Sequence, residues 1–77
     1  MEYTYNSIVT EPLLNHFDGS GNLDGGIMYD VPNSAMTDKT ITRCHWSECC
    51  AELIVYFENT LDAGDEIILD GIVADNT

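Results

Sequence analysis

The sequence contains almost no basic side chains. Its 77 residues include two, Lys39 and Arg43, against fourteen Asp and Glu, and the formal net charge is −12 at pH 7. A nucleic-acid-binding surface needs basic side chains that displace counterions from phosphate, and anionic membranes attract the same side chains. We therefore expect no nucleic-acid partner and no membrane partner. A basic protein partner or cations would suit this charge.

Long hydrophobic runs are also missing. No stretch approaches the roughly 18 apolar residues that a membrane-spanning helix needs. The start, Met1 to Tyr5, is acidic and polar and lacks the apolar region of a secretory leader. The chain has three cysteines, and without a secretion signal we expect them to be reduced thiols in a cytosolic compartment.

The sequence lacks the motifs of common catalytic sites. It has no glycine-rich phosphate loop and no Ser/His/Asp arrangement. In so acidic a chain, two neighbouring carboxylates carry no catalytic information. We therefore predict a protein that is not an enzyme, with no catalytic, cofactor-binding or metal-binding residues and no cofactor.

The short length limits the hydrophobic core. A chain of this size forms a single domain at most, residues 1–77. A single core below about 70–80 residues rarely supplies more than about 3–5 kcal/mol of stability. We therefore expect the chain to form an oligomer or to dock on a larger assembly.

The clearest structural signal is a pair of strands. Apolar residues alternate along Ala51–Phe57, and the Thr, Ile and Trp content of Thr40–Trp46 predicts a partner strand. Residues 40–57 are therefore expected to form an antiparallel hairpin. In an extended Thr40–Trp46, one face would carry Ile41, Arg43 and His45, and the other would carry Thr42, Cys44 and Trp46.

The N-terminal half has weaker signals. We predict a strand at Tyr3–Val9 and about two turns of helix at Glu11–Phe17, where apolar residues recur three and four apart. Four glycines make Asp18–Gly26 a loop. Ile27–Val31 is predicted to be a short strand, and Asn33–Lys39 a polar turn.

The last part of the chain supports two interpretations. In a helix over Ala63–Ala74, Asp62 would be the N-cap and Asp65 would lie in the first turn, near the positive end of the helix dipole. As strands, the same residues would form a 66–75 hairpin with Asp70-Gly71 as its turn, giving an all-β fold. The glycine costs a helix about 1 kcal/mol, yet the cap and the placement of acids favour the helix. The expected fold is therefore α+β, a small antiparallel sheet made of the 40–57 hairpin and N-terminal strands, with a C-terminal helix packed on it. The helix would present one stripe formed by Asp65, Ile68, Leu69, Ile72 and Val73.

Cysteine and histidine cluster near the expected hairpin end, at Cys44, His45, Cys49 and Cys50. These residue types would suit a zinc site, a Cys44–Cys49 disulfide or a Cys/His nucleophile. Four residues separate Cys44 from Cys49, a wide spacing for zinc ligands, and adjacent cysteines on an extended chain would point to opposite faces. We favour small buried or half-buried apolar side chains here.

Every second residue along the first part of the glycine-rich loop has an oxygen-bearing side chain. Its sequence resembles the start of a calcium loop, but an EF-hand needs Gly at the sixth position and Glu at the twelfth. Leu23 and Tyr29 occupy those positions, so we favour a flexible turn without an ion. His16 is expected to be a packed or surface side chain. The alternating oxygen-bearing residues are Asp18, Ser20, Asn22 and Asp24.

From Phe57 onward, FENTLDAGDEIILDGIVADN resembles the C-terminal module of small tailed-bacteriophage virion-associated structural proteins. In that module a strand ending in Phe leads into an acidic helix start and a helix of the form LDxIVA, so the resemblance also favours the helix. The matching residues are Phe57, Leu61, Ala63, Asp65, Glu66, Leu69, Asp70, Ile72, Val73 and Ala74.

The resemblance implies a non-enzymatic virion structural subunit, such as a capsid decoration, fibre or tail-associated protein. Its partners would be other virion proteins or further copies of itself as a homo-oligomer, and it would reside in virions assembled in the host cytoplasm. The N-terminal strand and the glycine-rich loop are the expected contact elements. The alternative is an acidic inhibitor that imitates nucleic-acid charge and occupies a basic protein surface.

Overall fold

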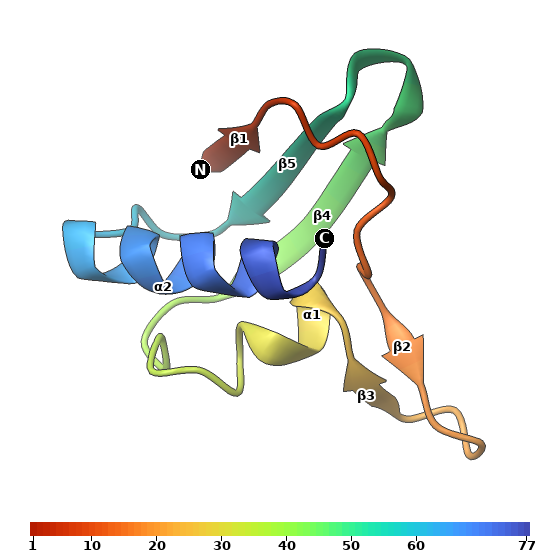
Figure 1. Ribbon diagram of the computed structural model, residues 1–77. Coiled ribbons are helices and arrows are strands. Elements are labelled where there is room, and N and C mark those ends of the chain that lie inside the picture. The colour runs from red at the N-terminus through yellow and green to blue at the C-terminus, as the bar shows by residue number, and fades with distance from the viewer.

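The computed structural model describes residues 1–77 and has an α+β architecture. A three-stranded sheet and a C-terminal helix form two layers, and a short two-stranded hairpin projects beside them (Figure 1). The elements are β1 (Glu2–Tyr5), β2 (His16–Phe17), β3 (Leu23–Gly25), α1 (Ile27–Asp30), β4 (Ile41–Ser47), a 3-10 turn (Glu48–Cys50), β5 (Glu52–Phe57) and α2 (Ala63–Asp75).

The main sheet has the order β1-β5-β4, and both pairings are antiparallel. The central strand β5 buries Leu53, Val55 and Phe57 on one face, as the alternation of its sequence predicts. The expected hairpin within residues 40–57 is thereby confirmed. At the start of the chain, the Met1 amine donates to the Phe57 carbonyl (2.6 Å), which ties the N-terminus to the end of the central strand.

A β-bulge in β4 changes the predicted faces of that strand. Ile41 pairs with Phe57 and Arg43 pairs with Tyr56, so Thr42 is an extra residue on β4. One extra residue shifts the alternation by one position. Ile41 therefore packs on the core with Cys44 and Trp46, and its predicted placement beside Arg43 and His45 was wrong.

The C-terminal helix is confirmed, and the 66–75 hairpin is wrong. Asp62 caps α2 by accepting from the Asp65 backbone N–H (2.8 Å), and Asp65 accepts in return from the Asp62 N–H (3.5 Å). This capping box satisfies two donors that the first turn would leave free. Burial of the predicted stripe against the sheet outweighs the propensity cost of Gly71. The buried residues of the helix are Asp65, Leu69, Ile72 and Val73.

The segment Ile27–Val31, predicted to be a strand, is instead the short helix α1 and its end. Ile27 and Val31 lie one helical turn apart and are both fully buried, together with Met36. Gly26 makes this entry possible with φ 91°, and a Cβ atom there would lie 2.6 Å from the Leu14 carbonyl oxygen. The helix therefore begins where the chain passes very close to the backbone of an earlier segment. The predicted polar turn at 33–39 contains no regular element beyond turns.

The predicted helix at Glu11–Phe17 was also wrong. Its residues are extended because distant backbone groups bind them: the Leu13 N–H donates to the Asn76 carbonyl (2.8 Å), and the Leu13 carbonyl accepts from the Ile27 N–H (2.9 Å). The predicted strand at Tyr3–Val9 is shortened to β1, and Ser7 beyond it has a left-handed backbone (φ 63°). Within the expected loop Asp18–Gly26, the last residues form β3.

The core lies between the sheet and the two helices. None of the helices has the length and the apolar character that a membrane crossing requires. The buried apolar residues are Ile27, Val31, Met36, Leu53, Val55, Phe57, Leu61, Leu69, Ile72 and Val73.

Candidate functional site

The first candidate surface is the face of the sheet that points away from the core. Side chains of β5 between the buried positions project to this outer face, where Ile54 and Tyr56 are half-buried. Arg43 and His45 on β4 flank them and are exposed. The Arg43 guanidinium lies 4.3 Å from the centre of the Tyr56 ring. Arginine and tyrosine are among the residue types that are enriched at protein interfaces.

The outer face consists of two rows of side chains across the three strands. One row joins Thr4, Ile54 and His45, and the other joins Glu2, Tyr56 and Arg43. Acidic, aromatic, aliphatic and basic groups therefore lie within one small area. This mixture suits contact with a protein surface better than contact with a uniformly charged ligand.

Both edges of the sheet are open, because β1 and β4 each pair with β5 alone. An edge strand presents a row of backbone donors and acceptors to a further strand. The bulge at Ile41–Arg43 disrupts one end of β4, and the regular pairing of this strand runs from Arg43 to Ser47. The outer face and this edge together form the candidate interface.

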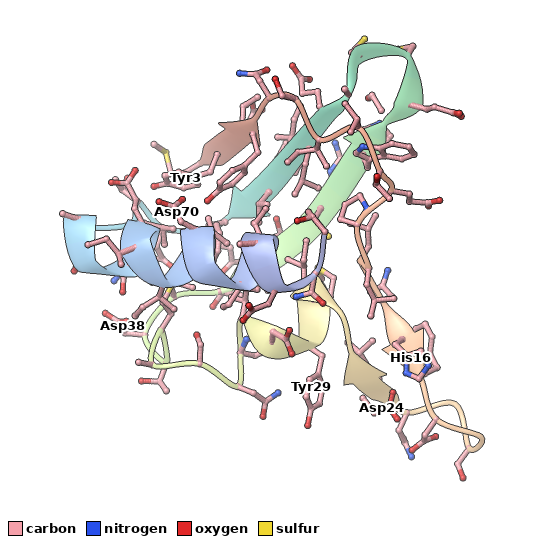
Figure 2. All side chains as sticks on the ribbon, in the orientation of Figure 1. Tyr3, His16, Asp24, Tyr29, Asp38 and Asp70 are labelled. Carbon is pink, nitrogen blue, oxygen red and sulfur yellow. The ribbon has the colours of Figure 1, made fainter.

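A groove between β1 and α2 carries a different chemistry. Residues of β1 and α2 line it, among them the acidic residues Glu2, Glu66 and Asp70. The Tyr5 hydroxyl donates to Asp70 Oδ1 (2.6 Å), and Figure 2 shows Asp70 of α2 beside β1. Burial, followed by this hydrogen bond to Asp70, raises the pKa of Tyr5 well above its ordinary value. Tyr5 therefore remains a neutral donor, and the negative charge of the groove comes from the carboxylates.

The structure does not assemble the cysteine and histidine cluster into one site. Cys44 is half-buried on the inner face of β4, and burial raises the pKa of its thiol to about 11. His45 is exposed on the outer face, where Ser47 Oγ lies 3.3 Å from its Nε2. The chain brings together no group of three or more His, Cys, Asp or Glu side chains that could hold a metal ion. All three cysteines are free thiols, so the Cys44–Cys49 disulfide is not present.

The expected burial of Cys49 and Cys50 was wrong. Both side chains are exposed rather than buried. They also lie on the same side of the chain, with their sulfur atoms 2.8 Å apart. The reason is the 3-10 turn Glu48–Cys50, which curls the backbone so that consecutive side chains do not alternate. The sequence shows that two cysteines are adjacent, but nothing in the flanking residues predicts the 3-10 turn that brings their sulfur atoms together.

The glycine-rich loop is the tip of the β2–β3 hairpin, and the Asp18 side chain binds backbone N–H groups within it. Asp18 Oδ1 accepts from the backbone N–H groups of Ser20 (2.7 Å) and Asn22 (3.0 Å). These hydrogen bonds hold the pKa of Asp18 below its ordinary value. His16 is a surface residue, and its Nδ1 lies 2.6 Å from Asp24 Oδ1 (Figure 2). The predicted turn and the surface placement of His16 agree with this arrangement.

Comparison with protein-family models gave no match, and neither the curated proteins nor the solved structures contain a matching chain.

Proposed function

We propose that this protein is a non-enzymatic structural subunit of a bacteriophage particle, such as a capsid decoration, fibre or tail-associated protein. It acts through contacts with other virion proteins or with copies of itself. The observation that carries the proposal is the one-sided covering of the sheet. The inner face holds the whole core, whereas the outer face and both edges are free for contacts.

The composition of the outer face supports a protein contact. The side chains of Ile54 and Tyr56 supply apolar area, and Arg43 is held over the Tyr56 ring by a cation–π interaction. An arginine fixed in this way loses less conformational freedom when a partner binds than a freely moving one does. The resemblance of residues 57–76 to phage virion-associated proteins suggests that the assembly is a virion.

The projecting β2–β3 hairpin supplies a second contact element. Phe17 is 57% exposed, and Leu13, just before the hairpin, is 46% exposed. Large apolar side chains on a projecting element contact water in the isolated chain and would be covered in an assembly. The prediction that the N-terminal strand and the glycine-rich loop make contacts remains part of this proposal.

The proposal is tested by the mass of the chain in solution, measured by light scattering over a range of concentration and salt. We expect a closed oligomer, or aggregation that a co-expressed shell or tail protein prevents. Ile54→Lys on the outer face should abolish this association. Ile67→Lys, which adds the same charge at an exposed site on α2 (72% exposed), should leave it intact.

Two results would contradict the proposal. One is a stable monomer at every concentration that no shell or tail protein recruits. The other is equal association of the Ile54→Lys and Ile67→Lys proteins, which would show that the outer face is not the contact.

The groove between β1 and α2 favours a second candidate function. Glu2, Glu66 and Asp70 line it, and the chain has no Lys or Arg beyond residue 43. Such a surface would attract basic side chains of a nucleic-acid-handling protein. The chain would then be an acidic inhibitor that occupies this partner's nucleic-acid site.

A further inference from the structure

The tip of the β4–β5 hairpin presents two thiols that converge. Cys49 Sγ and Cys50 Sγ lie 2.8 Å apart, and both side chains are exposed. The 3-10 turn Glu48–Cys50, which contains both residues, and the left-handed backbone of Ala51 after it (φ 48°, ψ 44°) fix this conformation. The β4 and β5 strands hold the turn from both sides, so the pair is presented by a rigid element.

We propose that Cys49 and Cys50 form a dithiol site that binds trivalent arsenicals, with both sulfur atoms bonded to one arsenic atom. The proposal goes beyond the structural role proposed above and does not depend on it. Soft ligands such as thiolates select soft acceptor atoms, and two sulfur atoms already in contact need little movement to share one.

Geometry favours a one-atom bridge over a disulfide between these residues. A disulfide brings its sulfur atoms to about 2.05 Å and usually needs Cα atoms about 4.4–6.8 Å apart. Neighbouring residues have Cα atoms only about 3.8 Å apart, so a disulfide here would be strained. A bridging atom keeps the two sulfur atoms farther apart than a disulfide does, and the short peptide link can span that separation.

The local charge also favours a neutral ligand. Hydrogen bonding to Cys49, followed by the charge of Cys49 and the nearby Glu52 carboxylate, raises the pKa of the Cys50 thiol. Zinc binding needs deprotonated thiols and further ligands, and no third metal-binding side chain joins the pair. A neutral trivalent arsenical accepts two thiols without further protein ligands.

The reaction is a condensation without change of oxidation state. With phenylarsine oxide, each S–H bond breaks and each sulfur forms a bond to arsenic. The As=O bond breaks, and its oxygen leaves with both thiol protons as one water molecule. Arsenic keeps its phenyl group and remains trivalent, so no oxidant or reductant is needed.

Cys44 provides the internal control. It is half-buried on the inner face, and burial raises its thiol pKa to about 11. Cys44 should therefore take no part in binding, although it belongs to the same hairpin.

The test is titration of the full chain with phenylarsine oxide, followed by intact mass and by counting of free thiols. The wild-type and Cys44→Ser proteins should each gain one phenylarsine oxide less one water and lose two reactive thiols. Cys49→Ser and Cys50→Ser should each bind roughly a hundredfold more weakly, because the second bond of the pair is intramolecular. Circular dichroism verifies that each serine variant is folded before its binding is compared.

Three results would overturn the proposal. The wild-type chain could form no such adduct, or one single variant, Cys49→Ser or Cys50→Ser, could bind as tightly as wild type. Alternatively, the adduct could be equally tight in guanidinium chloride. That result would show that neighbouring positions in the sequence, rather than the folded turn, create the site.

Discussion

At the scale of single residues, the most predictable feature is the start of α2. The sequence predicts Asp62 as the cap and Asp65 as an acid of the first turn, and the structure shows the capping bond together with a reciprocal bond to Asp65. A capping interaction involves residues three apart, so it can be inferred locally. The Cys49–Cys50 pair could not be predicted, because the convergence of its sulfur atoms depends on a 3-10 turn that the dipeptide does not encode.

Asp62→Ala removes the N-cap of α2 and should lower the free energy of unfolding by about 1 kcal/mol. The loss arises because the Asp65 backbone N–H, which Asp62 Oδ1 accepts from, keeps no protein partner. Urea unfolding followed by circular dichroism measures the change.

The matched control is Asp75→Ala at the other end of the same helix. It removes the same charge, but from the negative end of the helix dipole, where a carboxylate is unfavourable. Asp75→Ala should therefore be neutral or slightly stabilising. Equal destabilisation by the two variants would mean that net charge, and not the cap, determines the effect.

At the scale of elements, local patterns predicted the β4–β5 hairpin and α2 because their alternation and helical spacing match their burial. They failed for α1 and for the extended segment around Leu13. Those elements depend on backbone contacts with distant residues, such as the bonds of Leu13 to Ile27 and Asn76. A local propensity cannot show such contacts, and the same applies to the bulge in β4.

Gly26→Ala tests the entry to α1. Gly26 has φ 91°, and a Cβ atom would lie 2.6 Å from Leu14 O, so the variant should lose about 1–3 kcal/mol from backbone strain alone. Denaturant unfolding measures the loss. Gly19→Ala at the β2–β3 tip, where an added Cβ meets nothing within 4 Å, should change stability little. Comparable losses in both proteins would argue against the close approach at Gly26.

At the scale of the whole molecule, the charge of −12 was evident from composition, whereas its arrangement was not. Only the structure shows that Glu2 from one end of the chain joins Glu66 and Asp70 of α2 in one groove. The open outer face could not be predicted either, because alternation of apolar and polar residues along a strand does not reveal whether another element covers its second face.

The inhibitor hypothesis predicts a response to charge removal in the groove. Glu2→Gln with Glu66→Gln should weaken binding to a basic DNA-binding protein by about 0.2–1 kcal/mol per charge, and raised salt should weaken it further. Calorimetry at two salt concentrations measures both effects. Glu11→Gln with Glu58→Gln removes the same charge from exposed sites outside the groove, and equal weakening by this pair would exclude the groove as the binding surface.

The bond between the Met1 amine and the Phe57 carbonyl joins residues 56 positions apart, and it has a consequence for protein synthesis. The first strand leaves the ribosome long before the central strand that it pairs with. Until then its tyrosines and its free backbone edge remain available to other chains. The sheet closes only after β5 has been made, so a truncation before β5 would release a chain whose first strand has no partner.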